Sequence, residues 1–336
     1  MPAEPPEPRR LRRLGPARRH VLPATGHADL TARDAGPEDA LWHAQWEAQR
    51  HAVPPDGRAE PHRPRAELGG LAPEDFDRLV TLSWHHSEGP LCFDPYADPA
   101  LLDTSPAWRR ARGLLALVRA DLVSLTTYGE LPPQFVLRAA VDLEWPASQK
   151  PTLPAGRARE ADFPALTSLV DVLARADLLD VGQRRPYTPV RLAPAGHRAL
   201  DGESPGAGFA RFAGAVWREP SRVRATPDPF RTAPGLRGVV PFALWALATV
   251  PAETPADVVA AHAWPERLRL TLDARALAEA TRVGLLTQGA ALGLLRLRRV
   301  RGQSTVTRTP LLGTALRTTL PPYAWPVAGG ASSALG

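Results

Sequence analysis

The sequence predicts a mainly α-helical protein with small β-ribbons, arranged as two tandem domains of the same kind. Three stretches support this prediction, because each joins a short strand to a helix through a turn rich in proline and glycine. They are residues 121–138, 190–200 and 305–316. In the first, an apolar run stops at Gly129, and Pro132 and Pro133 open a new helix.

The composition sets limits on the class of protein. A chain of 336 residues can hold two or three domains. Its 38 prolines are about twice the usual share, so we expect short helices joined by stiff connections. No apolar run reaches the ~18 residues of a membrane span, and prolines and charges fill the place of a signal-peptide core. We therefore expect a cytoplasmic protein without membrane association.

The N-terminal third is expected to be only partly folded. Residues 1–37 have no helical or strand period and predict a disordered or loosely attached basic arm. Residues 38–104 predict a helical segment with proline-rich linkers, in which 38–51 form one helix. A second helix is expected to begin at Pro73, and residues 87–104 are expected to form a loop.

Residues 105–218 predict the first domain. Ser105 and Pro106 form a helix start, with a capping hydroxyl followed by proline at the first helical position. Further helices are expected after Pro132 and at residues 163–176. Two short strands around a turn should follow, and the glycines beyond them predict a loop. The strands and turn are expected at 178–179, 190–192 and 182–186, and the glycines are Gly202, Gly206, Gly208 and Gly214.

A helix followed by a two-stranded ribbon with a basic tip is typical of a winged helix. Residues 105–218 resemble uncharacterised bacterial proteins that contain an L-T-x-x-G-x-L-P segment, then a long helix, then a strand ending in T-P-A-G. The matching residues are Leu125, Thr126, Gly129, Leu131 and Pro132, and later Pro194, Ala195 and Gly196, with Ala193 in place of the threonine. The resemblance covers about a third of the chain. It implies a winged-helix fold and no known activity.

Residues 236–320 predict a second winged-helix-like domain after a proline-broken linker at 219–235. Residues 238–250 are the most apolar part of the chain and must be buried. The remaining pattern is again helical and then ribbon-like, before a flexible tail at 321–336. The expected elements are a short helix ending at His262, a helix at 272–283, and strands at 294–300 and 305–308.

Positive charge gathers at the C-terminal end. The net charge is +6, yet no acidic residue follows Glu279. The same stretch contains seven arginines, so the rest of the chain is close to neutral: Arg282, Arg296, Arg298, Arg299, Arg301, Arg308 and Arg317. A basic end on a near-neutral body suits a polyanion-binding surface. Codon bias is an alternative explanation, because Lys150 is the only lysine and arginine is abundant throughout.

The leading hypothesis is non-enzymatic nucleic-acid binding, most simply to duplex DNA, in a regulatory or DNA-associated role. In a winged helix, the helix before the ribbon can enter the major groove while the basic ribbon tip reaches phosphates. The alternative is a protein–protein interaction scaffold, because many winged helices bind proteins. The expected phosphate-contacting residues are Arg184, Arg185, Arg296, Arg298, Arg299, Arg301 and Arg308.

No motif indicates catalysis, a cofactor or a metal. The chain has no G-x-S-x-G elbow, no Walker-A loop and no G-x-G-x-x-G fingerprint, so an enzyme of unrecognised type is the third hypothesis. His85, His86 and Cys92 could in principle bind zinc, but no second ligand pair stands nearby. As Cys92 is the only cysteine, an intramolecular disulfide is excluded.

Overall fold

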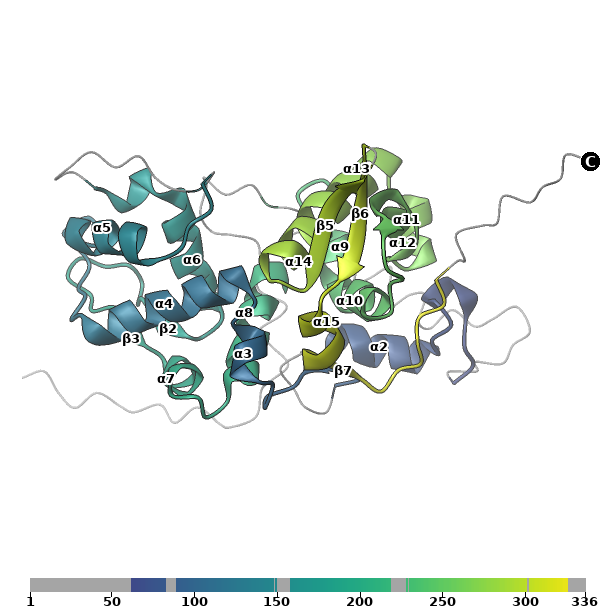
Figure 1. Ribbon diagram of the computed structural model, residues 1–336, viewed down its shortest axis with the longest axis horizontal. Helices are drawn as coiled ribbons and strands as arrows, with labels where there is room; N and C mark the ends of the chain where they lie inside the picture. Colours follow the sequence, from purple (N-terminus) through teal and green to yellow (C-terminus); the bar gives the residue numbers. More distant parts are fainter. Residues whose placement is uncertain are drawn as a thin grey trace, which may run out of the picture.

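The computed structural model describes residues 62–82, 89–147, 149, 158–218, 228, 230–300 and 302–325. In these ranges the protein is mainly helical, with three small antiparallel sheets. The helices and sheets form two lobes that lie side by side along the long axis of the molecule (Figure 1). The arm expected at 1–37 and the helix expected at 38–51 lie outside the described residues.

The segment before the two lobes is more ordered than the sequence indicates. After the short turn η1 (Ala66–Leu68), helix α2 (Pro73–Thr81) begins at Pro73 as predicted. The centroid of its Phe76 ring lies 5.6 Å from that of the Phe242 ring, in the lobe formed by the C-terminal part of the chain. The prediction of a loop at 87–104 is wrong, because this range contains strand β1 (Leu91–Phe93) and helix α3 (Pro99–Leu102).

The described part of the first unit (residues 105–218) contains five helices, each of which begins with a proline, and the sequence predicts all of them but the last. Ser105 caps the first helix by accepting a hydrogen bond of 3.2 Å from the backbone N–H of Trp108. The helices are α4 (Pro106–Ala120), α5 (Pro133–Asp142), α6 (Pro164–Arg175), α7 (Pro194–Asp201) and α8 (Pro205–Arg218). The turn η2 (Glu160–Asp162) precedes α6.

A small sheet completes the first unit. Strands β2 (Leu179–Asp180) and β3 (Arg191–Leu192) pair antiparallel. Residues 187–190, which lead into β3, pair antiparallel with an edge segment at 122–126. In this pairing the backbone N–H of Leu125 donates a 2.9 Å hydrogen bond to the carbonyl of Thr188. The hairpin between β2 and β3 is the ribbon that the sequence predicts.

Helix α8 contradicts the loop that its glycines predict. Gly206 and Gly208 lie in helix because they allow close packing: a Cβ on Gly206 would lie 1.7 Å from the carbonyl oxygen of Asp94. A Cβ on Gly208 would lie 2.7 Å from that of Ala199. These glycines therefore serve tight contacts rather than backbone flexibility.

The second unit (residues 236–320) is centred on the buried apolar helix α10 (Val240–Ala248), as predicted from its composition. The predicted helix at 272–283 is longer than expected and continues through a π-helical turn. Before the hairpin, the elements are α9 (Gly235–Gly238), β4 (Thr254–Pro255), α11 (Ala256–His262), α12 (Glu266–Thr271), α13 (Ala274–Ala280), η3 (Thr281–Thr287) and α14 (Gln288–Ala291). The hairpin β5 (Leu295–Val300) and β6 (Gln303–Arg308) precedes α15 (Pro310–Ala315) and β7 (Leu316–Thr318).

The two units share one order of elements. Each runs from a helix to a short strand, then to further helical segments, a hairpin and a short helix that begins with proline; the first unit has α5 and η2–α6 before its hairpin, and the second has α11, α12 and the continuous α13–η3–α14. In the second unit the sheet order is β4-β6-β5, so the short strand pairs with the last strand of the hairpin. The edge segment of the first unit pairs with its hairpin in the same way. The two units therefore share this strand pairing, although the second has one more helical segment before its hairpin.

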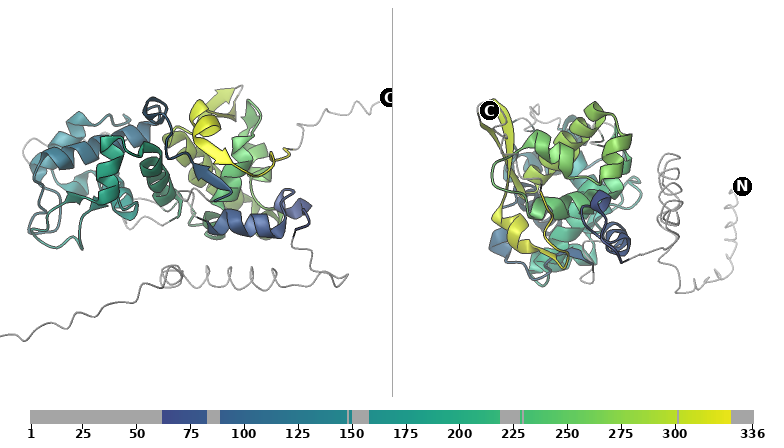
Figure 2. Two further views of the ribbon diagram at one scale, coloured as in Figure 1. Left: turned by 90° about the horizontal axis from the view of Figure 1, so that it is seen from below. Right: turned by 90° about the vertical axis from the view of Figure 1, so that its right-hand side faces the viewer.

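Two further sets of contacts between described residues join the second unit to the chain before it. Strand β1 pairs with β7, and Arg317 of β7 bonds Asp94 at 2.6 Å. Helix α8 lies between the lobes (Figures 1 and 2), and its Trp217 donates a 2.8 Å hydrogen bond to the carbonyl of Gly284. Residues 321–325, placed in a flexible tail by the sequence, instead pack on the second unit, where the Trp325 indole bonds Ala246 at 2.9 Å.

Candidate nucleic-acid interface

The hairpin of the second unit presents three exposed arginines. Strand β5 is the edge of its sheet, and Arg296, Arg298 and Arg299 are all exposed on it. Because side chains alternate along a strand, Arg296 and Arg298 share one face and Arg299 lies on the other. None of the three forms an ion pair with another residue that the structure describes. Their charge is therefore available to an external anion.

The other two predicted residues of this hairpin differ. Arg308 is exposed, but its guanidinium donates a 2.8 Å hydrogen bond to the carbonyl of Ala248 at the end of α10. Its position is thus fixed while its charge is not neutralised. Arg301 lies outside the described residues. The next residue, Gly302, has a φ of 87°, a left-handed conformation that suits the tight turn.

The helical segment before this hairpin also carries exposed charge. Arg275, Glu279 and Arg282 are exposed at helical spacing, and none forms an ion pair within the described ranges. The opposite side of this segment is packed: a Cβ on Gly284 would lie 2.6 Å from the ring of Phe230. The segment is thus buried on one side and exposes a mixed, mainly basic face on the other.

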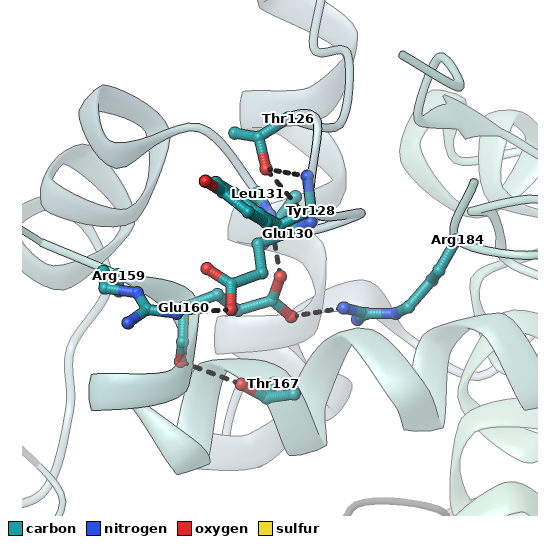
Figure 3. Close-up of polar contacts among 8 residues, drawn as sticks. All are labelled: Thr126, Tyr128, Glu130, Leu131, Arg159, Glu160, Thr167 and Arg184. Carbon is teal, nitrogen blue, oxygen red and sulfur yellow. Dashed lines mark hydrogen bonds and ion pairs between the residues drawn. The ribbon is translucent and has the colours of Figure 1, made fainter. Parts of the chain in front are cut away.

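In the hairpin of the first unit, Arg184 is not the free phosphate-contacting arginine that the sequence predicts. Arg184 donates a 2.8 Å hydrogen bond to Oε1 of Glu160, whose side chain is only 2% exposed (Figure 3). The other carboxylate oxygen of Glu160 accepts a 2.8 Å bond from the backbone N–H of Leu131. Because the guanidinium of Arg184 neutralises a buried carboxylate, its charge is not available to a phosphate. Arg184 is therefore not part of the candidate interface.

Contacts beside the Arg184–Glu160 pair explain the conformation of the L-T-x-x-G-x-L-P segment. The Thr126 hydroxyl accepts hydrogen bonds from the backbone N–H groups of Tyr128 at 3.4 Å and Glu130 at 3.3 Å (Figure 3). Gly129 has a φ of 72°, and a Cβ there would lie 2.2 Å from the carbonyl oxygen of Arg184. The segment therefore forms a tight turn against the hairpin loop, and its role within this chain is structural.

Arg185 is exposed next to Arg184, and its guanidinium bonds the side-chain oxygen of Gln183. No carboxylate among the described residues pairs with it. Arg185 therefore remains available for a phosphate contact.

Helix α6, which precedes this hairpin, is a poor candidate for entering a groove of DNA. Beyond Pro164, none of its residues is fully exposed. Arg175 pairs with Asp171 at 3.2 Å and also donates to the carbonyl of Ala215 in α8 at 2.6 Å. The open groove between α6 and the hairpin has acidic and basic walls, including Asp180 and Arg191. The two predicted arginine tips thus differ in available charge.

Sequence reasoning missed Glu160, which lies just before the helix expected at 163–176. Its contacts come from Leu131 and Arg184, which are 29 and 24 residues away in the sequence. No local pattern marks such a residue. A glutamate directly before an apolar helix, in a chain with a basic hairpin further on, was the available signal.

Other chemistry finds little support in the described ranges. Cys92 is buried in β1, and burial raises the pKa of its thiol, so the reactive thiolate is disfavoured at neutral pH. No group of three histidine, cysteine, aspartate or glutamate residues that could bind a metal occurs in the part of the chain that the structure describes. His85 and His86 lie outside it. None of the described helices is both long and apolar enough to cross a membrane.

Comparison with known proteins adds no assignment to this geometry. The chain matches no protein-family model, no curated protein and no solved structure. Any functional conclusion therefore depends on the two hairpins and the helices that precede them.

Proposed function

We propose that the two units are winged-helix domains and that the protein binds duplex DNA, without catalysis, through the second. The shared order of elements supports the fold, since in both units the short strand pairs with the last strand of the hairpin. In this proposal, α13 and η3 face the major groove and the β5–β6 hairpin contacts the phosphate backbone.

One observation carries the proposal: the exposed arginines of the β5–β6 hairpin have no carboxylate partners among the described residues. From Val240 to Arg308, no described side chain takes part in an ion pair. In the first unit most arginines are paired, as Arg184 is with Glu160. An unpaired guanidinium on an edge strand can bind phosphate oxygens through two parallel N–H groups.

Such contacts predict a strong dependence on salt. Each phosphate that an arginine neutralises releases condensed counterions, so log K falls with log salt by about 0.9 per contact. Contacts from Arg296, Arg298 and Arg299 would therefore contribute a slope of roughly −3. The protein is expected to bind duplexes of different sequence with similar affinity through these contacts, because phosphates carry no base information.

The test is a titration of the full chain into a fluorescent duplex at several salt concentrations. The double variant Arg296→Ala plus Arg298→Ala should bind at least about tenfold more weakly, and its salt slope should fall by roughly two. The matched control is Arg109→Ala plus Arg119→Ala, two exposed first-unit arginines already paired with Glu144 and Asp201. Equal affinity and slope in both double variants would refute the proposal.

A protein-interaction scaffold is the second candidate, and the first unit favours it. Its helix α6 is packed, and the Arg184–Glu160 pair leaves Arg185 as the one predicted phosphate-contacting arginine of its hairpin without a described carboxylate partner. A captured partner that is retained in high salt, with no nucleic acid in the complex, would support this role.

A further inference from the structure

The helical segment before the β5–β6 hairpin exposes a narrow strip of side chains. Arg275, Ala278, Glu279 and Arg282 are exposed on α13 and on the first turn of η3. At about 3.6 residues per turn, these four positions fall on one side of the helix. We call them the exposed strip. The opposite side of the segment is buried in the core of the second unit, so the strip is the side that a ligand can reach.

The charged side chains of the exposed strip are available to a ligand. Glu279 follows Arg275 by four residues and precedes Arg282 by three, which are the spacings at which opposite charges can pair along a helix. None of the three, however, forms an ion pair with any residue that the structure describes. Ala278 lies among them with only a methyl group, so a ligand surface can approach the helix closely.

The backbone that carries the exposed strip is fixed by side-chain hydrogen bonds. The Thr281 hydroxyl accepts a 2.8 Å bond from the indole of Trp264 and donates a 2.7 Å bond to the carbonyl of Leu277. At the π-helical turn, the Thr287 hydroxyl donates a 2.8 Å bond to the carbonyl of Arg282. Such turns inside helices are frequent at functional sites, and recognition residues need a rigid support. The direction of the strip is therefore set before any ligand binds.

The combination of one carboxylate with two guanidinium groups favours the reading of bases over a further phosphate contact. Phosphates repel a carboxylate, so Glu279 would weaken a strip that contacted only the DNA backbone. In the major groove, cytosine N4 is a donor that a glutamate accepts, and guanine O6 and N7 accept two N–H groups of one arginine. Adenine also has an amino donor, but its N7 acceptor lies beside that donor and repels a carboxylate. The strip therefore matches G·C base pairs.

The length of the exposed strip matches a short run of base pairs. Its two arginines are seven residues apart, about 10 Å along the helix axis, and successive base pairs lie about 3.4 Å apart. We propose that the exposed strip makes the second unit selective for DNA with a run of about three G·C base pairs. Arg275 and Arg282 each bind a guanine through O6 and N7, and Glu279 accepts a hydrogen bond from N4 of a cytosine between them. This selectivity rests on the proposed DNA binding, in which the hairpin contacts phosphates and the strip adds sequence preference.

The experiment offers the full chain a pool of duplexes in which about six central base pairs are randomised, and the bound fraction is sequenced. The wild type should enrich cores with three consecutive G·C pairs at least about fivefold over cores of A·T pairs alone. Arg282→Ala should lose the preference at one end of the run. Glu279→Gln should shift the preference at the middle pair towards A·T, because glutamine binds adenine N6 and N7.

Modified bases test whether the strip reads the major groove. In the most enriched core, replacing guanine by 7-deazaguanine removes the N7 acceptor and should weaken binding at least about fivefold. Inosine lacks only the minor-groove amino group of guanine, so it should leave binding unchanged. The opposite result would place the contacts in the minor groove and overturn the proposal.

The controls are Glu144→Gln and Arg109→Ala, which change two exposed side chains of the first unit that pair with each other. Both should enrich the same cores as the wild type, and thermal unfolding should show that all four variants remain folded. A wild type that binds duplexes with the expected salt dependence but enriches no core would overturn the base reading alone. So would a Glu279→Gln variant with an unchanged preference. A chain that binds no duplex would overturn both this selectivity and the proposed function.

Discussion

The two units are built in the same order but use arginine in opposite ways. In the first unit, arginines pair with carboxylates within the unit or just before it: Arg109–Glu144, Arg112–Asp103, Arg119–Asp201, Arg138–Asp121, Arg159–Glu130, Arg175–Asp171, Arg184–Glu160 and Arg211–Asp177. In the second unit, Arg237 and Arg317 pair with Asp228 and Asp94, which both precede the unit, whereas the arginines of β5 pair with no described carboxylate. Arginine abundance is therefore uninformative in this chain, and the pairing state separates structural from available residues.

The largest effect is expected at Arg184. In Arg184→Ala, the buried carboxylate of Glu160 loses its cationic partner, and the free energy of unfolding should fall by about 3 kcal/mol. Arg298→Ala, at an unpaired exposed position, should change it by less than about 0.5 kcal/mol. Denaturant unfolding of both variants measures the difference. Equal stability of the two variants would erase the contrast between the units.

The turn that supports Arg184 gives the second effect. Gly129→Ala places a Cβ against the carbonyl of Arg184, whereas Gly202→Ala meets no atom within 4 Å. Both glycines have left-handed backbones, with φ of 72° and 78°. The Gly202 variant should therefore lose only the ~1 kcal/mol of backbone strain, and the Gly129 variant roughly 2 kcal/mol more. Unfolding midpoints compare them, and similar losses would show that the turn can move away from the hairpin.

Arg317 should behave like a first-unit arginine. Its Asp94 partner has a side chain only 12% exposed, and Cys92 is buried in the same ribbon. Arg317→Ala should loosen the ribbon and raise the rate of Cys92 alkylation several-fold. Losing the nearby positive charge would raise the thiol pKa further and slow the reaction, so a faster rate reports opening. Arg296→Ala is the control, and an unchanged rate in both variants would contradict the prediction.

The smallest effect is expected for an exposed pair. Arg119 bonds Asp201 at 2.6 Å, and both side chains are 48% exposed. Arg119→Ala should cost about 0.5 kcal/mol, most of it lost in high salt, because water and ions screen such pairs. Unfolding at low and high salt checks this. A cost as large as that of Arg184→Ala would mean that burial does not rank these pairs.

The predictable part of the fold is the part with local signals. Prolines indicate the starts of α4, α5, α7 and α15, apolar spacing indicates α6, and continuous apolar character indicates α10. The hairpins followed from short apolar strands around turn residues. Ranges without such a signal, such as the β1 strand, were assigned to loops because their partners lie far away in the sequence.

The site was harder to predict than the fold. Arg184 and Arg298 look alike in the sequence, since both lie in or near a basic hairpin. What separates them is Glu160, which reaches Arg184 only after α6 and the hairpin have packed together. The glycines of α8 show the same limit: Gly206 lies in a helix, and the close approach of the Asp94 backbone, which no local pattern shows, is what requires a glycine there.

The pairing of β1 with β7 affects the order in which the parts of the protein can fold during synthesis. Its Asp94–Arg317 bond joins residues that are 223 positions apart. During synthesis, β1 leaves the ribosome long before β7 exists, and N-terminal domains fold first. The first unit must therefore fold beside an unpaired strand, and the two lobes acquire their final connection only when translation has nearly finished.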